Sequence, residues 1–100
     1  MQTKPQQMTA PLDKIIGIAY ESKRICEAFG ATEEAKAFGA VLESARNLEP
    51  ATYGTKSFDK AFFELNEAVH NAFNCAKNVY TQEKADSLQS PLMTIKRIAF

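Results

Sequence analysis

The chain has 100 residues, of which 45% are hydrophobic, and its twelve Lys and Arg side chains are balanced by twelve Asp and Glu. This size and composition predict one domain with a single core and exclude a chain that is disordered throughout. The zero net charge argues against broad binding to a nucleic-acid backbone, although a small phosphate ligand would need only two or three local cations.

The sequence offers no obvious segment for export or membrane insertion. The longest apolar run, IIGIAY at residues 15–20, is far shorter than the ~18 residues of a membrane span. The first ten residues lack the apolar centre of a secretory signal, so we expect a cytoplasmic protein. Cys26 and Cys75 are expected to be free thiols. With His70 as the single histidine, they do not form the closely spaced set that a zinc site requires.

Residues 1–9 are polar and are expected to form a flexible tail, followed by a single helical domain over residues 10–100. Thr9 is a candidate cap for the first helix, with Pro11 in its first turn. Apolar residues then recur at helical spacing up to Gly30, which is expected to end the helix. They are Leu12, Ile15, Ile16, Ala19, Cys26 and Phe29.

The second predicted helix starts at Thr32, a candidate cap, and carries Glu33 and Glu34 in the first turn, where the helix dipole favours anions. Pro50 is expected to stop it. Its apolar face predicts an amphipathic helix with one side in the core. This face comprises Ala35, Phe38, Val41, Leu42, Ala45 and Leu48.

The third predicted helix has the clearest pattern, with Ser57 as its candidate cap. Apolar residues follow in alternating steps of three and four, as in the seam of a helix bundle. They are Phe58, Phe62, Leu65, Val69, Ala72, Ala76 and Tyr80. We expect this helix to continue to about Leu88, a length of roughly 45 Å. So long a helix would overhang a compact monomer, and it therefore either kinks near Thr81 or is covered by other subunits.

Ser90 and Pro91 are expected to open a short last helix. No strand pattern appears anywhere in the chain. The sequence thus predicts an all-α fold, a small bundle of three main helices plus a short C-terminal helix. Ile18 and Ile25 widen the apolar surface of the first helix beyond one face, which together with the long third helix favours a homo-oligomer.

One loop has local chemistry of its own, the stretch YGTKS at residues 53–57. A helix N-terminus presents unpaired backbone N–H groups and a partial positive charge, which suit an anion. Lys56 adds a cation, Thr55 and Ser57 add hydroxyls, and the ring of Tyr53 can stack on a base. We expect a site for a small phosphate-bearing ligand here. The alternative is that Ser57 only caps the helix, Gly54 only turns the chain and Lys56 is solvated.

A second set of polar side chains recurs every four residues beside the apolar seam, flanked by Phe63 and Phe73. The set is Asn66, His70, Asn74 and Asn78. Amides, an imidazole and aromatic rings fit an interface or a neutral ligand, and the alternative is a plainly solvated stripe. His70 has no carboxylate orienter or nucleophile evident beside it, so the stripe does not predict catalysis.

Two segments resemble small helical phage proteins that sequester the cyclic nucleotide signals of bacterial immunity, sponges of the anti-CBASS or anti-Thoeris type. The segments are EAKAFGAVLE at 34–43 and LNEAVHNAFNCAKN at 65–78, about a quarter of the chain, with an Ala-Lys-x-Phe start and a Glu-Ala-Val core. The resemblance implies short helices in a compact oligomer, often a hexamer, that binds the signal between subunits.

In that family, polar and basic residues around the inter-helix loop and the next helix start help to hold the ligand. The equivalent region here is longer and contains TYGTKS where the family has a basic-acidic loop. Thr55, Lys56 and Ser57 therefore correspond to it by position and chemistry and not by identity.

These expectations combine into a non-enzymatic phage-type sponge that binds and sequesters cyclic di- or oligonucleotide immune signals. The alternative is a small helical inhibitor or regulator that docks a host defence enzyme through a helix face. We expect no enzyme activity, cofactor or metal, since no nucleophile–base pair or cofactor motif is visible. The expected partners are further copies of the chain and a cyclic nucleotide or a host protein in the host cytoplasm, without bulk nucleic acid or membrane.

Overall fold

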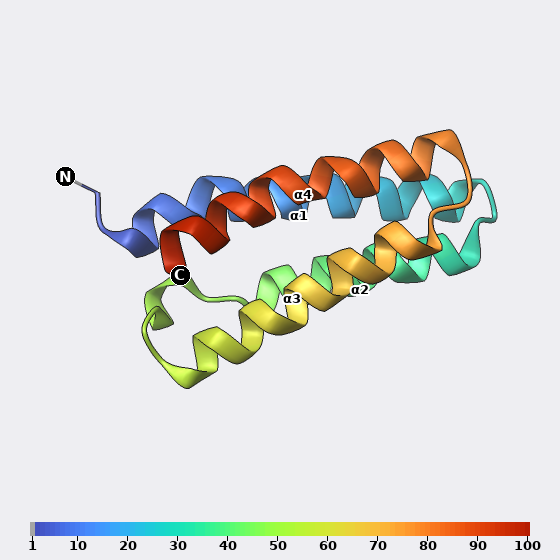
Figure 1. Cartoon of the computed structure of the whole chain (residues 1–100). Coiled ribbons are helices and arrows are strands. Elements are labelled where there is room, and N and C mark those ends of the chain that lie inside the picture. Colours follow the sequence, from blue (N-terminus) through green and yellow to red (C-terminus); the bar gives the residue numbers. More distant parts are fainter. Residues whose placement is uncertain (1) are drawn as a thin grey trace.

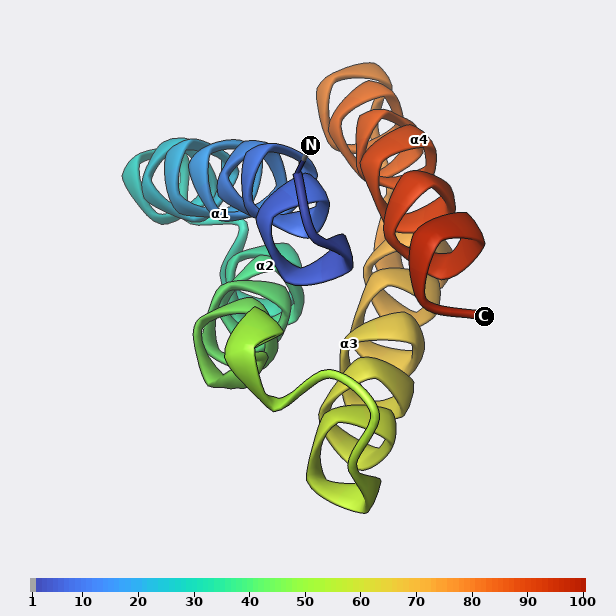
Figure 2. The same ribbon diagram turned by 90° about the vertical axis from the view of Figure 1, so that its left-hand side faces the viewer.

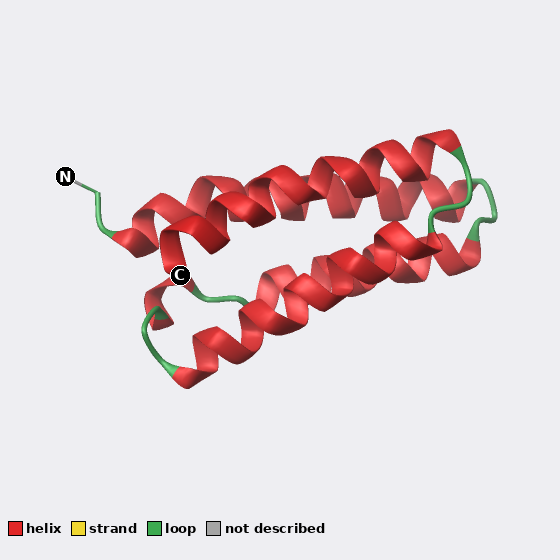
Figure 3. Ribbon diagram, viewed as in Figure 1, coloured by secondary structure: helices red, strands yellow, loops and turns green. Residues whose placement is uncertain are grey.

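The computed structural model describes residues 2–100 and contains four long helices (Figure 1). Their bounds are Lys4–Ala28 for α1, Thr32–Asn47 for α2, Lys56–Cys75 for α3 and Val79–Ala99 for α4. A short 3-10 helix, η1, covers Pro50–Thr52 between α2 and α3. Within residues 2–100 there is no strand (Figure 3). The all-α prediction is therefore confirmed for these residues, with four long helices in place of three long ones and a short one.

The helices run alternately up and down an elongated bundle with principal extents of 43 × 23 × 18 Å. The view from one end places α1 beside α2 and α4, with α3 diagonally opposite α1 (Figure 2). Of the four neighbouring pairs, α3 and α4 make the least extensive contact. Both ends of the described chain lie near the α2–α3 connection, at the same end of the bundle. This is the arrangement of an up-down four-helix bundle.

Helix α1 begins earlier than predicted, because Thr3 and not Thr9 is its cap. The Thr3 hydroxyl accepts the backbone N–H of Gln6 at 3.4 Å, and the Gln6 side chain accepts the backbone N–H of Thr3 at 2.9 Å. This reciprocal pair is a capping box, which satisfies two donors that a helix start leaves open. The segment expected to be a tail is thus helical from Lys4 onward, and residue 1 lies outside the described residues.

Pro11 lies inside α1 and not in its first turn. An interior proline costs about 3 kcal/mol in helix propensity. Met8, in the turn before it, and Leu12, directly after it, are both buried in the core. Their burial helps to offset that cost, since fully burying one such side chain stabilises a fold by roughly 1.5–3 kcal/mol.

The apolar faces predicted for the first two helices are mostly confirmed. All six predicted residues of the second face are buried, and so are Leu12, Ile15, Ala19 and Cys26 of the first. The two exceptions are Ile16, which is half-buried, and Phe29, which is 85% exposed because α1 ends at Ala28 and Phe29 already belongs to the turn. Thr32 is the first helical residue of α2 and does not cap it, since Ala31 occupies the cap position without a side-chain hydrogen bond.

The apolar seam predicted for the third helix is confirmed from Phe58 to Ala72. The predicted continuation to Leu88 is wrong, because α3 ends at Cys75. Asn78 starts a new helix: its side chain accepts the backbone N–H of Thr81 at 2.9 Å, while the Thr81 hydroxyl accepts the backbone N–H of Asn78 at 3.2 Å. This capping box replaces the predicted kink near Thr81.

The predicted short last helix is the C-terminal part of α4. Ser90 and Pro91 do not start a helix but lie inside one, because Leu88, before them, and Leu92, after them, are both buried in the core. The return of α4 along α1 also encloses the seam of α3 within a single chain (Figure 2). The overhang that favoured an oligomer is therefore absent from the described residues.

Candidate functional site

The four residues predicted to bind a ligand lie together in the connection from η1 to the first turn of α3. Tyr53 follows η1, Thr55 precedes α3, and Lys56 and Ser57 are its first two residues. Gly54 between them has φ +87, a left-handed conformation that glycine adopts without strain. This connection lies at the end of the bundle that also carries the chain termini (Figure 1).

Tyr53 is held by residues from two other parts of the chain. The Lys4 ammonium donates a hydrogen bond to the Tyr53 hydroxyl at 3.0 Å and lies 5.3 Å from the centroid of its ring. The ring packs edge-on against Phe58, with centroids 5.8 Å apart. Lys4 therefore adds a second cation to the predicted site, which the sequence did not reveal because the two residues are 49 positions apart.

Thr55, and not the predicted Ser57, caps α3. Its hydroxyl accepts the backbone N–H of Phe58 at 3.3 Å and donates to the carbonyl of Thr52 at 2.7 Å. Both functions of this hydroxyl are structural, so Thr55 has little left to offer a ligand. Ser57 is exposed within the first turn.

Two backbone donors remain open at the start of α3. Among the described residues no hydrogen-bond acceptor faces the N–H groups of Lys56 and Ser57, as expected for the first turn of a helix. The side chains of both residues are exposed. Asp59, also in the first turn, is exposed and brings a negative charge close to these donors. The arrangement can accept one anionic group, with Asp59 opposing it.

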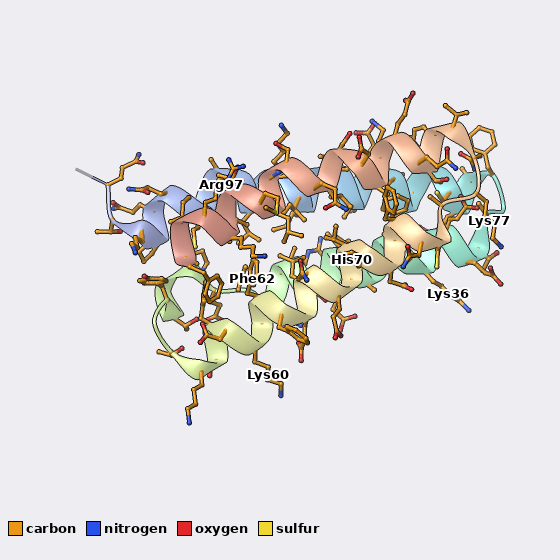
Figure 4. The ribbon with its side chains drawn as sticks, in the orientation of Figure 1. Lys36, Lys60, Phe62, His70, Lys77 and Arg97 are labelled. Atoms are coloured by element: carbon orange, nitrogen blue, oxygen red, sulfur yellow. The ribbon has the colours of Figure 1, made fainter. Side chains whose placement is uncertain are left out.

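The predicted polar stripe lies in the C-terminal half of α3, where Figure 4 labels His70. His70 and Asn74 are exposed and Asn66 is half-buried. The fourth member, Asn78, lies beyond the end of α3 and serves as the cap of α4. The stripe therefore has three members on one helix and no charged partner recorded for His70 among residues 2–100.

Two large aromatic side chains accompany this stripe at the surface. Phe63 is 61% exposed and Phe73 is 48% exposed. Phe73 also borders a shallow cavity of 370 Å³ whose other lining residues come from α4, namely Gln82, Glu83 and Asp86. This side of the α3–α4 contact thus combines exposed aromatic surface with two acidic side chains.

The α3–α4 loop is tied to the start of α2 by ionised groups. Lys77 donates to the Glu33 carboxylate at 2.8 Å, and this hydrogen bond, together with the opposite charge, lowers the pKa of Glu33 and raises the pKa of Lys77. Figure 4 shows Lys77 at the far end of the bundle from the predicted ligand site. Both side chains are largely exposed, so solvent screening leaves this ion pair with a small contribution to stability.

Three further observations concern metal binding, membrane insertion and the two cysteines. In residues 2–100, no three His, Cys, Asp or Glu side chains come together as a metal site would require. No helix of that part combines the length and hydropathy needed to cross a membrane. Both cysteines are free, with Cys26 buried and Cys75 half-buried.

Comparison with known proteins identifies no relative of this chain. No protein-family model, curated protein or solved structure gives a significant match to the chain. The functional argument therefore depends on the residues themselves.

Proposed function

We propose that this chain is a non-enzymatic binding protein that captures a cyclic di- or oligonucleotide and lowers its free concentration. The observation that carries the proposal is the pair of open backbone N–H groups at Lys56 and Ser57, beside the Lys56 ammonium and the Tyr53–Lys4 contact. The resemblance of segments 34–43 and 65–78 to phage sponge proteins supports the same function. The first segment lies on α2, and the second runs from the adjacent helix α3 into the α3–α4 loop.

The proposed recognition uses three kinds of contact. A phosphate oxygen accepts the two open N–H groups and a charge-assisted hydrogen bond from Lys56, and the Ser57 hydroxyl adds a further donor. A base stacks on the accessible part of the Tyr53 ring. Lys4, already over that ring, contributes a second positive charge. Binding by these contacts breaks no covalent bond, so the protein acts by sequestration.

Thermal unfolding in the presence of a ligand panel tests the proposal. The panel holds cyclic dinucleotides and cyclic trinucleotides, with a linear dinucleotide and inorganic phosphate as controls. Binding to the native state alone stabilises it by about 2.7 kcal/mol at a hundredfold excess over Kd. We expect at least one cyclic compound to raise the Tm more than both controls do. No shift with any cyclic compound would overturn the proposal.

A second candidate function, a helical inhibitor that docks a host protein, is favoured by the exposure of Phe63 and Phe73 on α3. With Glu83 and Asp86 beside Phe73, the matching partner surface is an amphipathic helix that carries basic residues. A photo-crosslinking residue at position 73 tests it, with position 36 on α2 as the control (Figure 4). One host protein crosslinked from position 73 alone is the expected result, and identical crosslinks from both positions would contradict it.

A further inference from the structure

The outer face of α1 carries a shallow depression of 580 Å³ that is lined by this helix alone. Helix α1 packs against α2 and α4, and its core residues lie on the side turned toward them (Figure 2). Helical winding places the residues of the depression on the opposite side, in the C-terminal half of the helix. They are Gly17, Tyr20, Glu21, Arg24, Ile25 and Ala28.

Two opposite charges lie near the middle of this outer face. Glu21 and Arg24 are exposed, and within residues 2–100 neither forms an ion pair. The Arg24 guanidinium instead donates a hydrogen bond to the Tyr20 hydroxyl at 3.3 Å and lies 5.8 Å from the centroid of that ring. The face therefore presents one anion and one cation about 4.5 Å apart along the helix axis.

The remaining residues of the outer face are apolar or small. Tyr20, 45% exposed, and the half-buried Ile25 lie along its two edges, while Gly17 and Ala28 lie near its centre line at the two ends. Outside its own stretch of helix, no atom lies within 4 Å of the place that a Cβ of Gly17 would occupy. Packing inside the chain therefore does not require this glycine, which is a poor helix former. A glycine on an open face does allow a second helix to come close.

Two copies of this face are complementary in charge when their α1 helices lie antiparallel. A twofold axis between Ser22 and Lys23 brings to one level the residues that lie equally far from it in the two copies. Glu21 of each copy is then level with Arg24 of the other copy, so two ion pairs can form between the copies. A shifted register separates these charges, and the ion pairs therefore fix the alignment.

The same axis also matches the uncharged residues. Gly17 of each copy is level with Ala28 of the other, and these small side chains let the helices approach closely at both ends of the contact. Tyr20 meets Tyr20 of the other copy along one edge, and Ile25 meets Ile25 along the other edge, each pair about 7.5 Å apart along the axis. Burial of these edges supplies affinity, while the ion pairs contribute mainly to alignment.

We propose that the outer face of α1 is a twofold dimer interface and that its occupant is the same face of a second copy of this chain. The contact over residues 17–28 spans about 17 Å of each helix. It is smaller than a standard interface, so we expect a weak dimer with a Kd of roughly 10 μM. The interface shares no residue with the nucleotide site proposed above and does not require the nucleotide.

Sedimentation equilibrium of the 100-residue chain without nucleotide measures the dimer. We expect the mass to rise from one chain to two over a concentration series that brackets the expected Kd. Arg24→Glu gives the outer face two acidic side chains, and Glu21→Arg gives it two basic ones. Each reversal places like charges opposite each other and is expected to raise the Kd more than about a hundredfold. Circular dichroism confirms that each variant is folded.

A mixture of the two reversals tests the antiparallel alignment. The acidic and the basic variant are expected to form a heterodimer with nearly the wild-type Kd, because each carboxylate again faces a guanidinium. The double variant Glu21→Arg with Arg24→Glu is expected to dimerise as the wild type does. Lys60→Glu reverses a charge on α3, diagonally opposite α1, and is the control expected to leave the Kd unchanged (Figure 4).

Three results would overturn the proposal. One is a wild-type protein that stays monomeric throughout the series, which would leave this face to a different partner. The second is a wild-type assembly, of two or more chains, whose mass and Kd neither reversal changes. The third is a mixture of the two reversals that sediments as monomers although the wild type dimerises.

Discussion

The Glu34 carboxylate accepts a hydrogen bond from the backbone N–H of Lys77 at 3.2 Å, across 43 positions of the chain. Glu34 is only 7% exposed, and the same oxygen also accepts the side-chain amide of Asn78 at 3.3 Å. One carboxylate from the first turn of α2 therefore satisfies two donors of the α3–α4 loop. It fixes the place where the chain reverses, and with it the position of α4.

Replacing Glu34 by alanine is expected to destabilise the fold by roughly 1–3 kcal/mol, because two partly buried donors lose the acceptor that the buried carboxylate provides. Chemical denaturation measures this as a lower midpoint with an unchanged slope. Glu33→Ala is the matched control, since Glu33 is the preceding residue but its contact with Lys77 is exposed to solvent. A loss in Glu33→Ala as large as that in Glu34→Ala would contradict the assigned role of Glu34.

The small contribution of the Glu33–Lys77 ion pair to the stability of the fold is expected to depend on pH, and the Glu33→Ala variant lacks it. Because the folded-state pKa of Glu33 is lowered from 4.5, its stabilising contribution is present above pH 4.5 and is lost as the pH falls through the folded-state value. The small difference between wild type and Glu33→Ala is expected to vanish in acid and in high salt.

Thr55→Ala is expected to cost about 1 kcal/mol of stability, because Thr55 caps α3. Ser57→Ala is expected to leave stability nearly unchanged, since alanine is the better helix former and Ser57 is exposed. Thermal unfolding of the two variants in parallel compares them directly. The reverse order of stabilities would restore Ser57 as the cap and place the start of α3 two residues later.

Cys26 is expected to react with a thiol reagent more than about tenfold more slowly than Cys75, because it is 2% exposed and burial raises the pKa of its thiol. Timed labelling at pH 8 followed by peptide mapping measures both rates.

The raised pKa of the Cys26 thiol also predicts that Cys26 favours the folded state below pH 9.0 and that the stability of the fold falls as the pH rises further, since the thiol of the unfolded chain ionises first. The Cys26→Ser variant is expected to lose less stability at alkaline pH than the wild type does. In the labelling experiment, equal rates for Cys26 and Cys75 would mean that the C-terminal turns of α1 open readily.

Lys56→Ala is expected to weaken binding of the cyclic nucleotide selected from the panel by roughly 1–3 kcal/mol, the value of a charge-assisted hydrogen bond. Its stability is expected to stay close to wild type, because Lys56 is exposed. Asp59→Asn is expected to tighten binding, since it removes the negative charge beside the open N–H groups. Calorimetric titration measures both, and wild-type affinity in Lys56→Ala would exclude the start of α3 as the ligand site.

Sedimentation tests the proposed assembly. A ligand bound between subunits, as the resemblance implies, requires a mass above that of the 11.1 kDa chain. We expect this larger species at micromolar concentration, either in the free protein or once the ligand is added. A monomer in both conditions would leave a site formed by one chain alone and would contradict the homo-oligomer that the sequence predicts.

The apolar periodicity of the sequence determined the helical class of the protein and most of its core. The predicted faces of α2 and α3 are buried from Ala35 to Leu48 and from Phe58 to Ala72. Their spacing alone identifies them, because an amphipathic helix has a single side that can be removed from water. The loop with local chemistry was also predicted from its residues, since a helix start has open donors whatever the fold around it.

Other features depended on contacts between distant residues. Ala76 and Tyr80 continue the apolar spacing of α3, and local pattern therefore predicts one long helix. The capping box of Asn78 and Thr81 was the sequence signal for a break, but the same residues also fit a helix interior. The hydrogen bonds from Lys77 and Asn78 of the α3–α4 loop to Glu34 decide between the two, and these contacts exist only once α2 and α3 have packed together.

The same holds at the proposed ligand site and inside the helices that contain proline. Lys4 reaches Tyr53 only because α1 extends through Pro11, and α4 continues through Pro91 because the turns on either side of it are buried. A proline inside a helix costs about 3 kcal/mol of helix propensity, which favours an end of the helix at Pro11 and at Pro91. Burial of the neighbouring side chains is of comparable size and is available only in the packed bundle, so the tertiary structure decided where these helices begin and end.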